Sequence, residues 1–265
     1  MIDTGTAVLL GVVQGLTEFL PVSSDGHLTL FQAGLGLDGN TLALDVALHV
    51  GTLLAMLLFF RADIARLFTG VIDRRNPARA ADRRGGLLIL IATVVTGAIG
   101  LGLKPWVERL TASYGAAALG FFLTALVLLR GERAGKRPGL DGDPATAPLW
   151  HALVIGAAQG VAVWPGLSRS ASTISAALVL GWAWPAAGRF SFLAAIPAIA
   201  GATLLTARDM TALPAAPTAA GFLAAFLVGW GALALLMRFL AARRLWPFAL
   251  YTMGMCFFAL FKSVK

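Results

Sequence analysis

Long apolar runs separated by short polar stretches make up most of the chain. A helix needs about 20 apolar residues to cross the hydrocarbon core of a membrane. Six runs approach or reach this length and predict transmembrane helices: Thr41–Phe60, Leu87–Leu103, Tyr114–Leu129, Arg189–Ala207, Ala219–Met237 and Trp246–Phe261. The stretches between them carry charges, Pro and Gly and are expected to be connections: residues 61–84, Lys104–Ser113, Arg130–Pro148, Arg208–Pro217 and Ala241–Arg244.

Two further apolar runs are short, and each stops at a proline, Pro21 or Pro165. A second short apolar piece follows each break. The pairs are Thr6–Leu20 with Leu28–Leu37, and Leu149–Trp164 with Ile174–Trp184. Such lengths favour re-entrant half-helices, which enter the membrane and return. Broken backbone at that depth is tolerated only where protein buries it or where it lines a wet cavity.

The two halves of the chain repeat one another at an offset of about 145 residues. The matching stretches are residues 11–15 with 156–160, 21–24 with 165–170, 51–54 with 201–205, and 104–106 with 246–248. Each half holds three spans, an odd number, so the second half must enter from the opposite face. This predicts an inverted-topology repeat, with the functional site where the interrupted helices of both halves meet. We expect one membrane domain, residues 1–265, with halves at about 1–137 and 148–265 joined by a cytoplasmic loop.

The composition predicts an all-α integral membrane protein. Hydrophobic residues make up 58% of the chain and charged residues 13%, with a mean hydropathy of +0.81, whereas a soluble domain is about a quarter charged. The formal net charge is +8, but 14 of the 21 Lys and Arg residues lie in three short stretches at the connections, residues 61–84, 130–137 and 238–244. The positive-inside rule predicts that clustering, and no basic face interleaved with aromatic residues indicates nucleic-acid binding. The single Cys256 excludes an intramolecular disulfide.

The same charges predict which side of the membrane each segment faces. The three basic connections are expected in the cytoplasm. Both termini, Lys104–Ser113 and Arg208–Pro217 are then expected on the other side. The N-terminus lacks a basic start and a small-residue cleavage site, so we do not expect a cleaved signal peptide.

The stretch Gln14–His27 concentrates polar side chains inside apolar sequence. Glu18 is the only carboxylate predicted well inside an apolar helix, and it shares a helix face with Gln14, four residues earlier. An acid at such depth is usually functional, as a metal ligand or a general base. The alternative is a structural carboxylate that bonds a neighbouring backbone group or an arginine.

The histidines differ in their surroundings. His27 is a candidate nucleophile, general acid/base or metal ligand, and Ser24 lies within one helical turn of it. The alternative for His27 is a satisfied structural residue. We expect structural roles for His49, within a span, and for His151, near a membrane interface. Asp25 suits either a helix cap or a site residue.

A second polar stretch surrounds Arg169, close to a predicted helix start. Free backbone N–H groups, hydroxyls and a guanidinium there make an anion site suited to phosphate. The hydroxyls belong to Ser168, Ser170 and Thr173. Alternatively, Arg169 neutralises Glu18. No histidine follows Arg169, which excludes the membrane phosphatase mechanism that uses two histidines downstream of its arginines.

Three stretches of this sequence are similar to the undecaprenyl-diphosphate phosphatase family, the bacitracin-resistance proteins of bacterial inner membranes. QGLTEFLPVSSDGH (14–27) resembles the family's (E/Q)xxxE and PVSSxGH segments. WPGLSRSASTIS (164–175) resembles its PGxSRSxxT segment, and RFSFLAAIPAIAGAT (189–203) resembles a third. The similarity runs from about Thr6 to the last predicted helix.

The resemblance implies hydrolysis of undecaprenyl diphosphate to undecaprenyl phosphate and phosphate, which recycles the lipid carrier of peptidoglycan and other envelope polymers. It also implies a divalent metal, Mg²⁺ or Ca²⁺, a site facing the periplasm, and an inverted-repeat fold with re-entrant helices. The partners expected are this substrate and membrane lipid, with a homodimer as a further expectation and no nucleic acid. The rival function is a polyprenyl-phosphate transporter or flippase, because transporters share this layout.

The motifs carry the family's site residues onto this chain position by position. The candidate catalytic residues are Glu18, Ser24, His27 and Arg169. The candidate diphosphate-binding residues are Gln14, Ser168, Arg169, Ser170 and Thr173. The candidate metal ligand is Glu18, with Gln14 and Asp25 as further candidates. Two positions depart from the family pattern. Gln14 stands where many members have Glu, and Asp25 stands where Thr is usual.

Overall fold

The structure is a computed structural model that describes residues 2–37, 41–110, 113–137, 141–206 and 214–264. These residues form eleven α-helices and one short 3-10 helix, and no strand occurs among them, so the all-α prediction is confirmed. The helices are α1 (Thr4–Phe19), α2 (Ser24–Gly34), α3 (Leu42–Phe59), α4 (Arg61–Ile72), η1 (Pro77–Arg79), α5 (Ala80–Glu108), α6 (Tyr114–Gly135), α7 (Leu149–Val161), α8 (Arg169–Val179), α9 (Trp184–Thr206), α10 (Ala215–Ala241) and α11 (Trp246–Ser263).

The six predicted spans are all helices: α3, α5, α6, α9, α10 and α11. Five of these helices are long and apolar enough to cross a membrane; α11, with 18 residues, is outside that group. The protein is therefore a multi-pass membrane protein. Residue Ala207, the predicted end of the fourth span, lies outside the described residues.

The four short pieces are helices as well, α1, α2, α7 and α8. The second helix of each pair begins about one turn earlier than predicted. Serine caps explain the difference, because Ser23 Oγ accepts from the N–H of Gly26 and Ser168 Oγ accepts from the N–H of Ala171. A side-chain oxygen at this position satisfies an orphan donor of the first turn and fixes the helix start.

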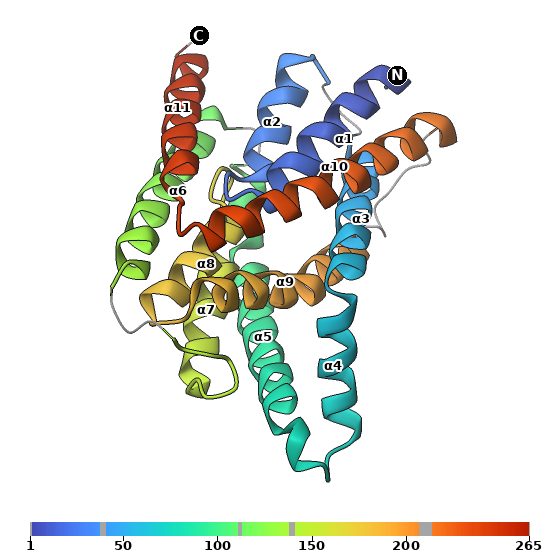
Figure 1. Ribbon diagram of the computed structural model, residues 1–265. Coiled ribbons are helices and arrows are strands. Elements are labelled where there is room, and N and C mark those ends of the chain that lie inside the picture. Colours follow the sequence, from blue (N-terminus) through green and yellow to red (C-terminus); the bar gives the residue numbers. More distant parts are fainter. Residues whose placement is uncertain (1, 38–40, 111–112, 138–140, 207–213, 265) are drawn as a thin grey trace.

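Both short pairs turn back on themselves. Figure 1 shows α1 descending from the N-terminus and α2 returning beside it, and Ile2 and Leu37 pack against one hydrophobic cluster. In the second pair, Trp182 follows α8 and its indole donates to His151 Nδ1, on the first turn of α7, at 2.7 Å. That each pair enters and leaves the membrane on one side stays a prediction.

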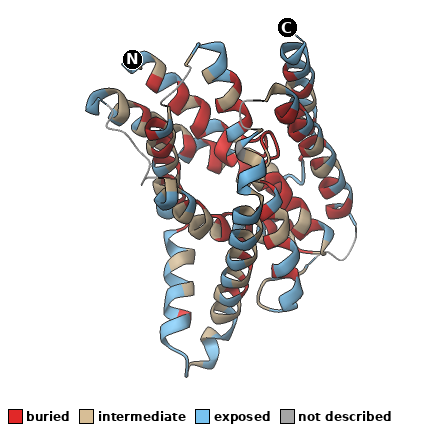
Figure 2. Cartoon of the chain, turned by 180° about the vertical axis from the view of Figure 1, so that it is seen from behind, coloured by how far each residue is buried: buried red, intermediate tan, exposed pale blue. Residues whose placement is uncertain are grey.

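The connection predicted over residues 61–84 is mostly helical, which corrects the prediction. Apolar residues recur at helical spacing among the arginines, at Ile64, Leu67, Phe68 and Val71. That spacing produces an amphipathic helix. The resulting α4 packs along the first turns of α5, where Gly70 lies against Asp82. Figure 2 shows this arm as mostly exposed.

Three other predicted connections are shortened by helices that run further than expected. Helix α5 continues past Pro105 to Glu108, since a proline near a helix end removes only one backbone hydrogen bond. Helix α10 begins at Ala215, with Pro217 in its first turn, where a proline is tolerated. Helix α6 extends to Gly135, because Glu132 near its end contacts Lys136 and the backbone N–H groups at the start of α11.

The repeated sequence motif packs in the same way in both halves. A Cβ on Gly11 would lie 2.4 Å from a carbonyl oxygen of α10, and one on Gly15 would lie 2.8 Å from an amide nitrogen of α10. Their counterparts Gly156 and Gly160 bring α7 equally close to α5. Small residues allow helix backbones to approach this closely. Helices α2 and α8 also cover matching residues, 24–34 and 169–179. These correspondences support duplication; the inverted topology stays a prediction.

The two breaks meet at the centre of the molecule. A Cβ on Gly26 would lie 2.9 Å from the Cα of Gly166, which itself has a φ of +81°. From α6, Thr124 Oγ1 donates to the carbonyl of Gly166 and accepts from the N–H of Ser168, both at 2.9 Å. Ser23 adopts a φ of 72°, a strained conformation for a residue with a side chain. The fold thus fixes both breaks against each other.

The two chain ends lie at one end of the molecule, and the arm of α4 and early α5 projects from the other (Figure 1). The end opposite the chain termini therefore carries the arginines of residues 61–84. This placement agrees with the expectation that both termini share one side of the membrane and the arm lies on the other.

Candidate functional site

A cavity of about 630 Å³ lies beside the two breaks. Its polar lining comes mainly from Thr17, Glu18, Ser23, Ser24, Asp25, Asp45, His49, Thr93, Thr96, Lys104, Gln159, Ser168 and Arg169. The remaining lining is largely apolar and comes from the first half of α3 and the last parts of α5 and α9. Those helix segments lie at the ends remote from the α4 arm, so the cavity is distant from that arm.

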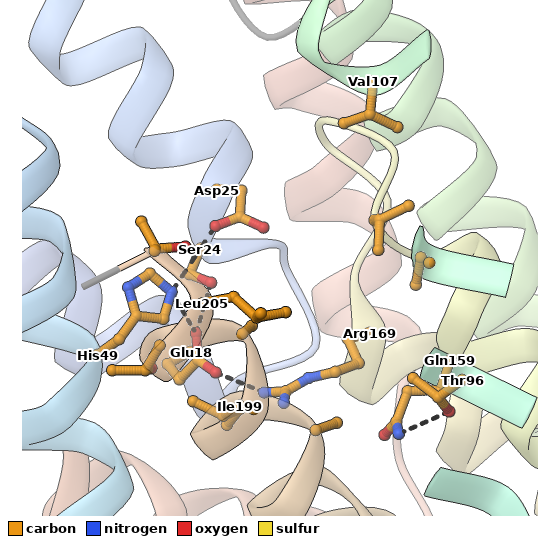
Figure 3. A pocket seen from close by; sticks show the side chains of 18 of the residues that line it. Glu18, Ser24, Asp25, His49, Thr96, Val107, Gln159, Arg169, Ile199 and Leu205 are labelled. Carbon is orange, nitrogen blue, oxygen red and sulfur yellow. Dashed lines mark hydrogen bonds and ion pairs between the residues drawn. The ribbon is translucent and has the colours of Figure 1, made fainter. Parts of the chain in front are cut away.

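Glu18 is the centre of the polar contacts (Figure 3). Its side chain is 4% exposed; one oxygen pairs with the Arg169 guanidinium, and the other accepts from Ser24 Oγ at 2.6 Å. A buried ion pair is stable only with close geometry and further hydrogen bonds, because both charges lose their hydration. The structure thus shows the pairing of Arg169 with Glu18 that the sequence offered as one alternative, and the anion site at Arg169 stays a prediction.

Ser24 and Arg169 occupy equivalent places in the two halves. Each is the first residue of the second helix of a broken pair, and each follows a serine cap. Both reach the same carboxylate, Glu18. The sequence predicted that the two polar stretches form one site, and the structure brings these three residues together.

Gln14 supports Glu18 from within the protein. Its Nε2 donates to Glu18 Oε2 at 3.1 Å, and the residue is fully buried and does not line the cavity. Its Oε1 is buried without a hydrogen-bond partner among the described residues. The amide therefore orients the carboxylate, and a direct contact between Gln14 and a ligand in the cavity is not part of this arrangement.

His27 is turned away from the cavity. Its Nδ1 lies 2.7 Å from the backbone oxygen of Ser23, its Nε2 lies 2.7 Å from the hydroxyl of Tyr251, and the residue is 1% exposed. The ring stacks on Tyr251 with centroids 5.5 Å apart. Because the carbonyl only accepts, Nδ1 carries a proton and the unprotonated Nε2 accepts from tyrosine. Both nitrogens are satisfied, which matches the structural alternative for His27.

His49 is the residue that sequence reasoning missed. It lines the cavity, with Nε2 4.0 Å from Glu18 Oε2 and 3.8 Å from Asp25 Oδ1 (Figure 3). The signal in the sequence was its spacing from Asp45, which puts both on one face of α3. The sequence predicts a structural role for His49, within a span, whereas its place in the cavity lining makes it a candidate site residue.

The hydroxyls around Arg169 divide into two groups. Ser168 lines the cavity and caps α8. Ser170 and Thr173 are buried behind it and do not line the cavity; Ser170 Oγ contacts Ser168 Oγ, and Thr173 Oγ1 contacts Ser191 Oγ. The latter two are placed to hold the start of α8 in position.

The donor set does not fit a resident metal ion. Carboxylates of Glu18, Asp25 and Asp45 line the cavity, but Glu18 already accepts from an arginine, a serine and an amide. Across the described residues, no group of three or more His, Cys, Asp or Glu side chains is arranged to hold a metal. We therefore derive no step through Mg²⁺ or Ca²⁺ held by the protein.

The chain is similar to known proteins over nearly its whole length. Residues 7–258 match the family described as bacitracin resistance protein BacA. The chain belongs to the BacA family. The undecaprenyl-diphosphatase of Methanosphaera stadtmanae is 39% identical over 267 residues, covering 95% of each chain. That of Desulfosudis oleivorans is 42% identical, covering 92% of this chain and 93% of its own. That of Syntrophotalea carbinolica is 41% identical, covering 96% and 97%.

The match extends over both polar stretches of this BacA-family protein, since residues 14–27 and 164–175 fall within it. The resemblance stated from the motifs is thus confirmed at the level of the family. The roles of individual residues stay predictions.

Proposed function

We propose that this protein hydrolyses undecaprenyl diphosphate to undecaprenyl phosphate and inorganic phosphate. The observation that carries the proposal is the contact of one buried carboxylate, Glu18, with a serine hydroxyl and a guanidinium at a cavity wall. That set supplies a base, a nucleophile and an anion-binding group within a few ångströms of each other. The names of the BacA-family relatives agree with this reaction.

Arg169 is proposed to bind the diphosphate. In the described structure its guanidinium pairs with Glu18, and a phosphate that enters the cavity competes for the same donors. Arginine offers several N–H groups in a planar fork, so it can contact phosphate while it keeps one bond to the carboxylate. Ser168 and the first N–H groups of α8 add neutral donors at the same place.

Ser24 is proposed as the nucleophile and Glu18 as its base. The hydroxyl donates to Glu18 at 2.6 Å, so the proton has a direct acceptor when the oxygen attacks the terminal phosphorus. The bond from that phosphorus to the bridging oxygen breaks, Glu18 passes its proton to that oxygen, and undecaprenyl phosphate leaves. Water then attacks the phosphoserine phosphorus and gives a proton to the Glu18 carboxylate. The bond from phosphorus to Ser24 Oγ breaks, Glu18 returns the proton to Oγ, and phosphate is released.

Proton transfer to Glu18 also affects Arg169. When Glu18 accepts the serine proton, it becomes neutral and attracts the guanidinium less strongly. The arginine is then available to stabilise charge on the phosphoryl oxygens at the moment when that charge moves. The three residues thus act as one unit.

The prenyl tail is proposed to lie along the apolar wall of the cavity. Leu42, Val46, Leu101 and Ile199 contribute to that wall. Because the cavity lies away from the α4 arm and the positive-inside rule assigns the arm to the cytoplasm, we propose a site that faces the periplasm. We further propose an inner-membrane location, an inverted repeat and a role in carrier-lipid recycling and bacitracin resistance.

The test is phosphate release by the purified protein in detergent, with undecaprenyl or farnesyl diphosphate as substrate. We expect continuous release by the wild type and a phosphoserine at Ser24 when the reaction is quenched within one turnover. Absence of release, together with movement of labelled undecaprenyl phosphate across vesicles that contain the protein, would support the transporter instead. Homodimer formation is a separate expectation, measured by light scattering of the same sample.

A further inference from the structure

The tautomer of His49 follows from its contacts. Nδ1 lies 2.8 Å from the backbone oxygen of Asp45, which only accepts, so Nδ1 carries a proton. The other nitrogen, Nε2, faces oxygens of Glu18 and Asp25 at 4.0 and 3.8 Å. A bare lone pair facing two carboxylates is unfavourable, whereas an N–H there interacts favourably with both. The geometry therefore favours a proton on Nε2 as well, and a positive charge on the ring.

Negative charge is in excess around the place where an anionic substrate binds. Glu18, Asp25 and Asp45 all line the cavity, whereas the Lys and Arg side chains of its described lining are two, Lys104 and Arg169. One oxygen of Asp45 accepts from Gln32 Nε2 at 2.6 Å, whereas the Asp25 side chain is 65% exposed and faces His49. A diphosphate adds further negative charge and is repelled by a carboxylate without a cation beside it.

We propose that His49 is a positioning residue that neutralises Asp25 and holds it away from the bound diphosphate. The proposal rests on the proposed function for the identity of the ligand. His49 acts through Asp25 and Glu18, and it forms no bond to the reacting phosphorus. It supplies a positive charge from α3, opposite the one that Arg169 supplies from α8.

The pairing of His49 with Asp25 can be tested at Asp25 itself. A threonine at this position carries no charge, so Asp25→Thr leaves nothing there for His49 to balance. Removing His49 should therefore be harmful mainly because Asp25 remains. Removing the Asp25 charge as well should restore binding.

The experiment measures binding and turnover separately. Binding uses farnesyl methylenebisphosphonate, which has a carbon bridge in place of the hydrolysed oxygen, and turnover uses farnesyl diphosphate. We expect His49→Ala to raise the dissociation constant and KM roughly 2- to 5-fold, the range of a partly exposed ion pair, since Nε2 lies 3.8 and 4.0 Å from the two carboxylates. The change in kcat should be smaller. The double variant His49→Ala/Asp25→Thr should bind more tightly than His49→Ala alone and close to the wild type.

The matched control is His151→Gln, a histidine outside the cavity whose replacement keeps an acceptor for Trp182. This variant should match the wild type in both measurements. Thermal unfolding of each variant checks that it is folded. Wild-type binding by His49→Ala, or failure of Asp25→Thr to improve it, overturns the proposal. If wild type binds the bisphosphonate without hydrolysing the diphosphate, the proposed function fails while the binding comparison still tests His49.

Discussion

Two glutamates in this protein are equally buried and have different surroundings. Glu18 on α1 and Glu132 on α6 are both 6% exposed. Glu132 Oε2 accepts from the backbone N–H groups of Leu245 and Trp246, at 2.5 and 2.6 Å, and Lys136 Nζ lies 2.5 Å from Oε1. It thus caps the start of α11 from another helix.

The partners of Glu18 are side chains, and it lines the cavity. Backbone N–H groups at a helix start stay where the helix is, so Glu132 has fixed partners. Side chains such as Ser24 and Arg169 can exchange one hydrogen bond for another when a ligand enters. Burial alone therefore does not identify a functional acid, whereas exchangeable partners beside a cavity do.

The largest expected effect comes from Glu18→Gln. The substitution keeps the shape but removes the base for Ser24 and the charge that orients Arg169. We expect phosphate release to fall by about 10³-fold or more, the scale seen when a group acting on the transition state is lost. The measurement is initial-rate phosphate release at saturating substrate. Turnover within about tenfold of wild type would show that Glu18 is not the base of the reaction.

The second largest expected effect comes from the cation that pairs with Glu18, in comparison with the one that pairs with Glu132. Arg169→Lys keeps the charge but loses the planar fork, and we expect phosphate release to fall by about 10²-fold. Lys136, the cation beside Glu132, is 58% exposed at its side chain. Lys136→Ala should therefore change turnover by less than about twofold. Equal losses in both variants would contradict the distinction between the two glutamates.

The third effect is on stability. Glu132→Ala leaves the buried N–H of Leu245 and the part-buried N–H of Trp246 without their acceptor, at a cost of about 2 kcal/mol. We expect a lower midpoint of thermal unfolding in detergent. Phosphate release per folded molecule should stay within about threefold of wild type. A loss of turnover without a loss of stability would show that Glu132 also serves the reaction.

Local motifs explain which parts of the site were predictable. Glu18, Ser24 and Arg169 lie next to breaks that Pro21 and Pro165 mark in the sequence, so their convergence followed from the repeat. Glu132 was missed because its partners follow 113 residues later and because it lies in a stretch that reads as a basic connection. No local sequence pattern predicts a contact between residues so far apart in the chain.

The histidines show the same limit. A sequence gives the spacing of His27 and His49 along their helices but not which helix faces the cavity. His27 lies within the PVSSxGH motif and yet points to α11, where Tyr251 covers it. His49 lies in an ordinary apolar span, and only the packing of α3 against the first break brings it to Glu18.

The smallest expected effect tests His27 through its partner. Tyr251→Phe keeps the stacked ring but removes the hydroxyl that donates to His27 Nε2. We expect a loss of about 1 kcal/mol in stability, the net value of one hydrogen bond, and turnover within about twofold of wild type. The measurements are thermal unfolding and phosphate release across pH 5 to 9, a range set about the ordinary pKa of histidine.

A structural His27 leaves the shape of that pH profile unchanged, because the ring still faces away from the cavity and takes no proton from Ser24. A histidine that acted on the substrate would alter the profile once its hydrogen bond to Tyr251 was removed. A loss of turnover in Tyr251→Phe as large as that expected for Glu18→Gln would show that His27 takes part in the reaction. The place of His27 within the motif, rather than its contacts in the fold, would then have indicated its role.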